Sequence, residues 1–154
     1  MPPITQIKLE IPKTQPAWAV LYCRALVLFI VQGVLILVMH AISGWKTPRG
    51  EFPIGFRLDP WHGGLHLVTG VIATYIGFGP PSEKAAVRFT QGFGIFYLLL
   101  AVFGTFTKFH FGLELGFSEN AIHWILGGYS ALIGFGPGIV AAFRGQSTPE
   151  RKSL

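Results

Sequence analysis

Cysteine and charge are both scarce in this chain. Of its 154 residues only Cys23 is a cysteine, and 12% are charged. A lone cysteine has no partner for an internal disulfide or a Cys-x-x-Cys motif, which excludes a disulfide scaffold and a dithiol redox site. The low charge accompanies 51% hydrophobic residues and a mean hydropathy of +0.51, a balance outside the range typical of soluble globular chains. The composition therefore indicates a membrane protein.

Sequence signatures of common enzymes are also absent. The chain contains no glycine-rich phosphate loop, no Gly-x-Ser-x-Gly elbow and no pair of carboxylates within an apolar segment. The net charge of +5 does not indicate nucleic acid, since the basic residues are scattered at the ends of apolar runs and form no stripe. We therefore predict a non-enzymatic protein whose partners are lipids and other membrane-protein subunits.

Four long apolar stretches define the predicted architecture. Each has about the 20 residues that a helix needs to cross ~30 Å of hydrocarbon, and proline-containing or polar loops separate them. The fold class is therefore expected to be an all-α integral membrane bundle of four transmembrane helices. The predicted helices cover residues 17–43, 61–79, 87–107 and 121–143.

Capping residues mark the starts of two predicted helices. Asp59 is followed by Pro60, a pair typical of a helix N-cap and its first helical position. Ser118 and Asn120 supply similar polar side chains before the fourth helix. We expect these residues to begin the second and fourth helices.

The basic residues around the helices predict an orientation. Because lysine and arginine are enriched in cytoplasmic loops, the side with more of them is expected to face the cytoplasm. We expect the membrane to be a bacterial inner membrane or a photosynthetic membrane. The side with both termini carries Lys8, Lys13, Arg24, Lys84, Arg88, Arg144, Arg151 and Lys152, and the other side carries Lys46, Arg49, Arg57 and Lys108. We predict a cytoplasmic N-terminal segment at 1–16, a transmembrane domain at 17–143 and a cytoplasmic tail at 144–154.

An internal repeat organises the chain. The segment from His66 to Pro80 aligns without a gap with the segment from His123 to Pro137. Both contain the histidine, a glycine four residues later and the ending Ile-Gly-Phe-Gly-Pro. A weaker echo joins Gln32-Gly33 to Gln91-Gly92. We infer a duplicated helical hairpin whose two copies run in the same direction, related by an axis along the membrane normal.

The repeated histidines are the leading candidates for a cofactor site. His66 and His123 are expected about one turn inside the membrane, where an imidazole needs a hydrogen bond, a metal or a macrocycle. Gly70 and Gly127 lie one turn further on the same helix faces. Their missing side chains have two interpretations: close packing of a neighbouring helix, which we favour, or clearance for a haem or chlorophyll-type pigment ligated by the histidines.

A metal site is a second hypothesis for the same region. His62 and His66 are four residues apart and share a helix face, as in helical zinc sites, with His123 as a further nitrogen donor. Glu119 and Asp59 are nearby oxygen donors. The competing interpretation is that these histidines bind backbone carbonyls or lipid headgroups. We expect the remaining two, His40 and His110, to be interfacial.

A resemblance is carried by the motif Asn120-Ala-Ile-His123-Trp-Ile-Leu-Gly127 and its companion Leu65-His66-Leu-Val-Thr-Gly70. Over residues 25–143 the chain resembles a family of small bacterial four-helix membrane proteins of uncharacterised function. The resemblance implies the four-helix architecture and lends no activity or cofactor. The long first loop, with Pro48, Pro53 and Pro60, departs from the family pattern and is a candidate docking surface.

Our leading functional hypothesis is a non-enzymatic accessory subunit of a larger membrane complex, photosynthetic or respiratory, with His66 and His123 as axial ligands of a chlorophyll-type pigment or haem. The alternative is a free-standing haem- or metal-binding redox protein in which the two histidines meet across the bundle. A small-solute transporter is third, because the polar residues expected near mid-helix are few. They are Gln32, Gln91, Thr74 and Ser130.

Overall fold

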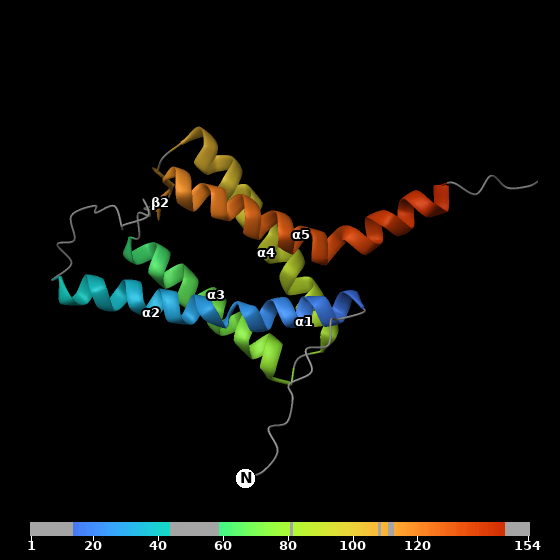
Figure 1. Ribbon diagram of the computed structural model, residues 1–154, viewed down its shortest axis with the longest axis horizontal. Coiled ribbons are helices and arrows are strands. Elements are labelled where there is room, and N and C mark those ends of the chain that lie inside the picture. The colour runs from blue at the N-terminus through green and yellow to red at the C-terminus, as the bar shows by residue number, and fades with distance from the viewer. Residues whose placement is uncertain (1–13, 44–58, 81, 108, 111–112, 147–154) are drawn as a thin grey trace, which may run out of the picture.

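Helices dominate the structure of this protein, so the all-α prediction is confirmed (Figure 1). The predicted N-terminal segment and C-terminal tail lie largely outside the described residues, as do most of the first loop and its Pro48 and Pro53. The computed structural model describes residues 14–43, 59–80, 82–107, 109–110 and 113–146.

The first predicted helix is interrupted at one residue. Helix α1 (Gln15–Ala25) and helix α2 (Val27–Ile42) are separated by Leu26. The two run nearly in line in Figure 1 and together make a rod of 28 residues. At its start, the Thr14 side chain accepts a hydrogen bond from the backbone N–H of Ala17 at 3.4 Å. The prediction of one long element therefore holds, with a break that the hydropathy pattern does not show.

Helix α3 (Pro60–Phe78) begins as predicted. The Asp59 side chain accepts a hydrogen bond from the backbone N–H of His62 at 2.8 Å, which satisfies a donor that the first helical turn leaves unpaired. Pro60 occupies the first turn, where a missing N–H has no cost. Asp59 is therefore confirmed as the N-cap.

The other two helices start earlier than predicted. Helix α4 (Glu83–Phe106) and helix α5 (Phe117–Gln146) both include a polar first turn that hydropathy alone leaves out. The predicted capping role of Ser118 and Asn120 is wrong, because both lie inside α5. The Asn120 side chain instead donates a hydrogen bond to the Thr105 hydroxyl at 3.2 Å, which links α5 to the end of α4.

A short β ladder lies in the connection between α4 and α5. Strand β1 (Phe109–His110) pairs antiparallel with strand β2 (Leu113–Glu114). The ladder is two residues long on each side, so it does not change the helical class of the fold.

Glycines bring the helices together in two close pairs. A Cβ atom on Gly33 of α2 would lie 2.7 Å from the backbone nitrogen of Leu67 in α3. A Cβ atom on Gly94 of α4 would lie 2.8 Å from the backbone nitrogen of Ala131 in α5. Only residues without a side chain permit this approach. The chain therefore forms one hairpin from α1, α2 and α3 and another from α4 and α5.

Equivalent hydrogen bonds join the helices of each pair. The Arg24 side chain donates through Nε to the carbonyl oxygen of Gly77 at 2.8 Å. The Gln91 side chain donates through Nε2 to the carbonyl oxygen of Gly134, also at 2.8 Å. The two glycines occupy the same place in the repeated Ile-Gly-Phe-Gly-Pro sequence. Arg24 is therefore the structural counterpart of Gln91.

The weaker sequence echo does not correspond to structural equivalence. Gln32 is exposed on α2, whereas Gln91 binds α5. Gly33 packs against a backbone, whereas a Cβ atom on Gly92 would meet no atom within 4 Å. A two-residue match between apolar helices can occur by composition, and here the helix packing selects a different register.

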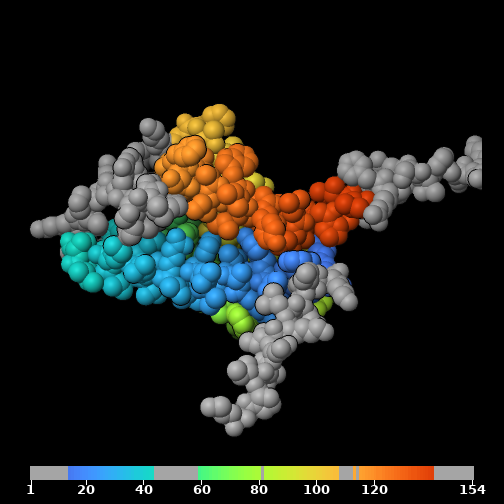
Figure 2. All heavy atoms as spheres, in the orientation of Figure 1, coloured from blue at the N-terminus to red at the C-terminus, as the bar shows by residue number. Residues whose placement is uncertain are grey.

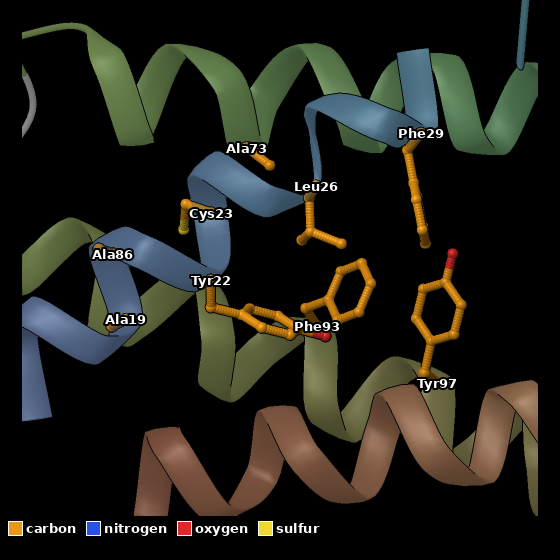
Figure 3. Packing of buried hydrophobic residues seen from close by; sticks show 9 residues of the cluster. All are labelled: Ala19, Tyr22, Cys23, Leu26, Phe29, Ala73, Ala86, Phe93 and Tyr97. Carbon is orange, nitrogen blue, oxygen red and sulfur yellow. The ribbon is translucent and has the colours of Figure 1, made fainter. Parts of the chain in front are cut away.

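Aromatic rings fill the centre where the two hairpins meet (Figure 3). The ring of Phe93 stacks on that of Tyr97, with centroids 4.2 Å apart and planes 19° apart. Tyr22 meets Phe93 edge-on at 5.9 Å. These rings come from α1 and α4, so they join the first hairpin to the second. The core also contains Ala19, Cys23, Leu26, Phe29, Ala73 and Ala86.

The outside of the bundle is apolar and part of its inside is polar. Every helix carries large exposed hydrophobic residues, such as Leu28 at 67% and Phe106 at 81% exposure. Ser130 and Thr90 are fully buried, and the Ser130 hydroxyl donates to the Thr90 carbonyl oxygen at 2.8 Å. Within the described residues, two helical segments are long and apolar enough to cross a membrane, Gln15–Ile42 and Glu83–Phe106.

The C-terminal part of α5 leaves the bundle. This helix contains Pro137, and its last turns project beyond the other helices (Figures 1 and 2). Ile139 and Val140 are about half exposed there, at 53% and 48%. The packed part of the molecule that positions the histidines therefore ends before this extension.

Candidate functional site

Two pairs of buried polar side chains occupy the first two turns of α3 and α5. On α3 the pair is His62 and His66, and on α5 it is Glu119 and His123. Each pair is spaced by four residues, which places both members on one helix face. Their exposed fractions are between 2% and 6%. We call these four residues the histidine cluster.

Sequence reasoning found these four residues but missed how they are related. His66 and His123 are repeat partners, 57 positions apart. The same interval joins His62 to Glu119, so the two pairs of the cluster occupy corresponding positions of the sequence repeat. Extending the repeat by one helical turn toward the N-terminus would have shown this.

The rings of the cluster lie close together. His62 and His66 have ring centroids 4.7 Å apart and planes at 85°. His62 and His123, from different hairpins, have centroids 5.7 Å apart and planes at 33°. Glu119 and His123 also lie within electrostatic range of His62 and His66, respectively. The structure therefore brings the predicted site residues of both repeats together.

Aromatic side chains from α2 and α4 pack against two of the imidazoles. Phe29 of α2 stacks on His66, with centroids 4.4 Å apart and planes at 26°. Tyr97 of α4 meets His123 edge-on at 5.3 Å. Figure 3 shows Phe29 and Tyr97 facing each other across the core, with the tyrosine hydroxyl directed toward Phe29. Neither residue is predictable from the sequence as part of the site, because an aromatic side chain in an apolar helix carries no distinctive local signal.

One nitrogen of each imidazole in the cluster is buried without a hydrogen bond to the described residues. The Nδ1 atoms of His62, His66 and His123 are buried and have no hydrogen-bond partner in the part of the chain that the structure describes. The Tyr97 hydroxyl is also buried and has no hydrogen-bond partner among the described residues. An unsatisfied buried polar group destabilises a fold by about 1–3 kcal/mol. Three such atoms on adjacent rings therefore indicate a site for a ligand.

His40 shows how a buried histidine can be satisfied without a ligand. Its Nδ1 lies 2.9 Å from the carbonyl oxygen of Ile36, one turn earlier in the same helix. Its exposed fraction is 8%, so within the bundle it is buried rather than placed at the surface. The side chain of His110, the other histidine predicted to be interfacial, lies outside the described residues.

Gly70 and Gly127 contact neighbouring helices. A Cβ atom on Gly70 would lie 2.7 Å from the backbone nitrogen of Ile30, and one on Gly127 would lie 2.7 Å from that of Leu98. Helix backbone therefore fills the space above each glycine. This is the packing interpretation, and the geometry leaves no clearance there for the flat face of a macrocycle.

An apolar groove lies on the other side of α3. It has a volume of about 660 Å³ and opens between α3 and α4. None of the four cluster residues lines it. Its lining consists of Trp61, Gly64, Leu65, Val68, Phe96, Leu99, Leu100, Phe103 and Leu113. The groove and the histidine cluster are therefore separate features.

The donor atoms of the cluster do not already converge on one point. Within the described residues, no group of three or more His, Cys, Asp or Glu side chains has the arrangement of a formed metal site. Close rings with unpartnered nitrogens can nonetheless present their lone pairs to a ligand after side-chain rotation. The chemistry available here is ligation by imidazole nitrogens and a carboxylate, together with hydrogen bonding from a phenol.

Comparison with known proteins identifies no relative of this chain. No protein-family model matches the chain, and neither the curated proteins nor the solved structures contain a match. The resemblance to small four-helix membrane proteins therefore rests on the two histidine motifs alone.

Proposed function

We propose that this chain is an integral membrane protein in which four helical rods cross the bilayer. The apolar exterior of every helix supports this, because hydrocarbon accommodates apolar surface and leaves polar groups to pair inside the protein. The rod Gln15–Ile42 and helix α4 are long and apolar enough to span. Helices α3 and α5, of 19 and 30 residues, approach or exceed the ~20 residues that a span needs.

The four rods form a duplicated helical hairpin in this proposal. Supporting it, the first glycine of each Ile-Gly-Phe-Gly-Pro segment accepts a side-chain hydrogen bond from the preceding rod, at 2.8 Å in both hairpins. The repeated histidine of each hairpin also contacts an aromatic ring of that preceding helix. Both kinds of contact therefore occur in each hairpin, as expected for two related units that run in the same direction.

The biochemical role that we propose is a non-enzymatic subunit of a larger membrane complex that holds a ligand at the histidine cluster. The observation that carries this role is the set of three buried imidazoles whose Nδ1 atoms have no protein partner among the described residues. Ionisable residues at membrane depth are costly and usually mark a functional site. A chlorophyll-type pigment or haem is not part of the proposal, since helix backbone occupies the space at Gly70 and Gly127.

Outward-facing glycines support the role as a subunit. At several positions on the helix surfaces a Cβ atom would meet nothing within 4 Å. Small residues on a lipid-facing surface let another helix approach closely. These positions are Gly64, Gly92, Gly128, Gly136 and Gly138. The excess of basic residues beside the termini supports a bacterial inner or photosynthetic membrane with both termini in the cytoplasm.

Gentle purification tests the role as a subunit. We expect the tagged chain, extracted from its native membrane in a mild detergent, to elute with other membrane proteins in an assembly well above its own 16.9 kDa. A harsh detergent that strips partners serves as the control and should release the chain. Elution of the chain alone under mild conditions, with no stoichiometric companion, would contradict the role.

A further inference from the structure

We propose that His62, His66, His123 and Glu119 bind one divalent first-row transition-metal ion between α3 and α5. This inference deepens the proposed function and rests on it, because it names the ligand of the histidine cluster. Facing helices of a bundle commonly build metal sites in this way, from histidine and carboxylate side chains that project into the core.

The donor set indicates the class of metal. Three imidazole nitrogens and one carboxylate oxygen suit ions such as Zn²⁺, Fe²⁺, Co²⁺ or Mn²⁺, and four is the number of ligands in a tetrahedral site. Soft sulfur ligands that would favour Cu(I) are missing from the cluster. Cys23 packs beside Gly77, which lies about 16 Å along α3 from His66 at 1.5 Å per residue.

The spacing of the rings fits a shared ion. Two imidazoles bound to one metal at ~2.1 Å hold their ring centroids about 5 Å apart, whichever ring nitrogen binds. The observed separations are 4.7 Å for His62 and His66 and 5.7 Å for His62 and His123. His62 is therefore close to both of the other imidazoles. In the proposed site, the three side chains rotate so that one nitrogen of each faces the ion.

Glu119 must also reorient to reach the ion. Its carboxylate lies back over Gly116, where a Cβ atom would meet Oε2 at 2.5 Å. Binding requires the carboxylate to turn toward His62, which lies within electrostatic range of it. Because the residue is 2% exposed, this movement takes place inside the protein.

The local charges favour a cation. Asp59 and Glu119 are the two carboxylates that act electrostatically on His62. Negative charge beside the imidazoles lowers the cost of burying a metal cation there. Neutral imidazoles add ligands without adding charge.

Metal titration of the purified chain tests this site. After removal of bound metal with a chelator, the detergent-solubilised protein is titrated with Co²⁺, followed by its visible absorption, and with Zn²⁺, followed by calorimetry. We expect one ion per chain and an absorption intensity typical of a four-coordinate site. The His66→Ala and His123→Ala variants should each bind metal more than about 100-fold more weakly. Even replacing a residue that only supports a metal ligand lowers metal affinity by about 10–100-fold.

Matched variants keep the test independent of folding. His40→Ala removes another buried histidine whose Nδ1 is satisfied by its own helix, and it should retain full metal affinity. Glu119→Gln keeps the side-chain shape and should weaken binding while helical content and elution volume stay unchanged.

The possible outcomes separate this inference from the proposed function. Absence of stoichiometric binding to folded wild-type protein, or binding that is unchanged in both His66→Ala and His123→Ala, would overturn the metal site even if the chain elutes in a large assembly. Stoichiometric binding by a chain that elutes alone would support the metal site and contradict the subunit role.

Discussion

Replacing Gly127 with leucine is expected to destabilise the protein by about 3 kcal/mol or more. A Cβ atom there would lie 2.7 Å from the backbone nitrogen of Leu98 and 3.0 Å from the backbone carbon of Tyr97. Backbone cannot move aside as a flexible side chain can, so α4 and α5 must separate. Thermal unfolding in detergent, followed by helical circular dichroism, measures the loss.

The adjacent glycine provides the control. A Cβ atom on Gly128 would meet nothing within 4 Å, so Gly128→Leu should change stability little or raise it slightly, since leucine is the better helix former by up to ~1 kcal/mol. Both variants carry the same substitution in the same helix. Equal destabilisation by the two would contradict the close pairing of α4 and α5.

Replacing Tyr97 with alanine is expected to cost about 3–5 kcal/mol, because it removes a fully buried ring and leaves a cavity. This ring stacks on Phe93 at 4.2 Å, meets His123 at 5.3 Å and lies 6.2 Å from Phe29. It therefore joins the core to the histidine cluster. The same unfolding measurement applies.

Tyr75→Ala is the matched control for Tyr97→Ala. Tyr75 lies on α3 and is 61% exposed, so its loss should change stability by less than about 0.5 kcal/mol. If Tyr97→Ala unfolded at the same temperature as Tyr75→Ala, the placement of Tyr97 at the centre of the core would be contradicted.

The sequence predicts the helical rods well because long apolar runs have few alternatives to helix. It predicts the Asp59 cap because a side-chain oxygen before Pro60 has a specific local effect. It does not predict the starts of α4 and α5, where a polar first turn such as that at Glu83 is helical without being apolar. The break at Leu26 has no proline or glycine to mark it.

The candidate site is predictable in its residues and less so in its surroundings. His66 and His123 follow from the repeat, and His62 follows from helical spacing. Whether Gly70 and Gly127 admit a helix or a cofactor depends on what packs against them, which is a tertiary property. The same holds for Phe29, whose stacking on His66 requires α2 and α3 to adopt a particular register.

Accessibility to a membrane-impermeant maleimide tests most directly whether the helices cross the membrane. Single cysteines are placed, in a Cys23→Ala background, at three exposed serine or threonine positions that follow α2, precede α4 and follow α4. They are Ser43, Ser82 and Thr107. In intact cells Ser43→Cys and Thr107→Cys should react, whereas Ser82→Cys should react only after the membrane is permeabilised. Equal labelling of all three positions in intact cells would contradict the four-span account.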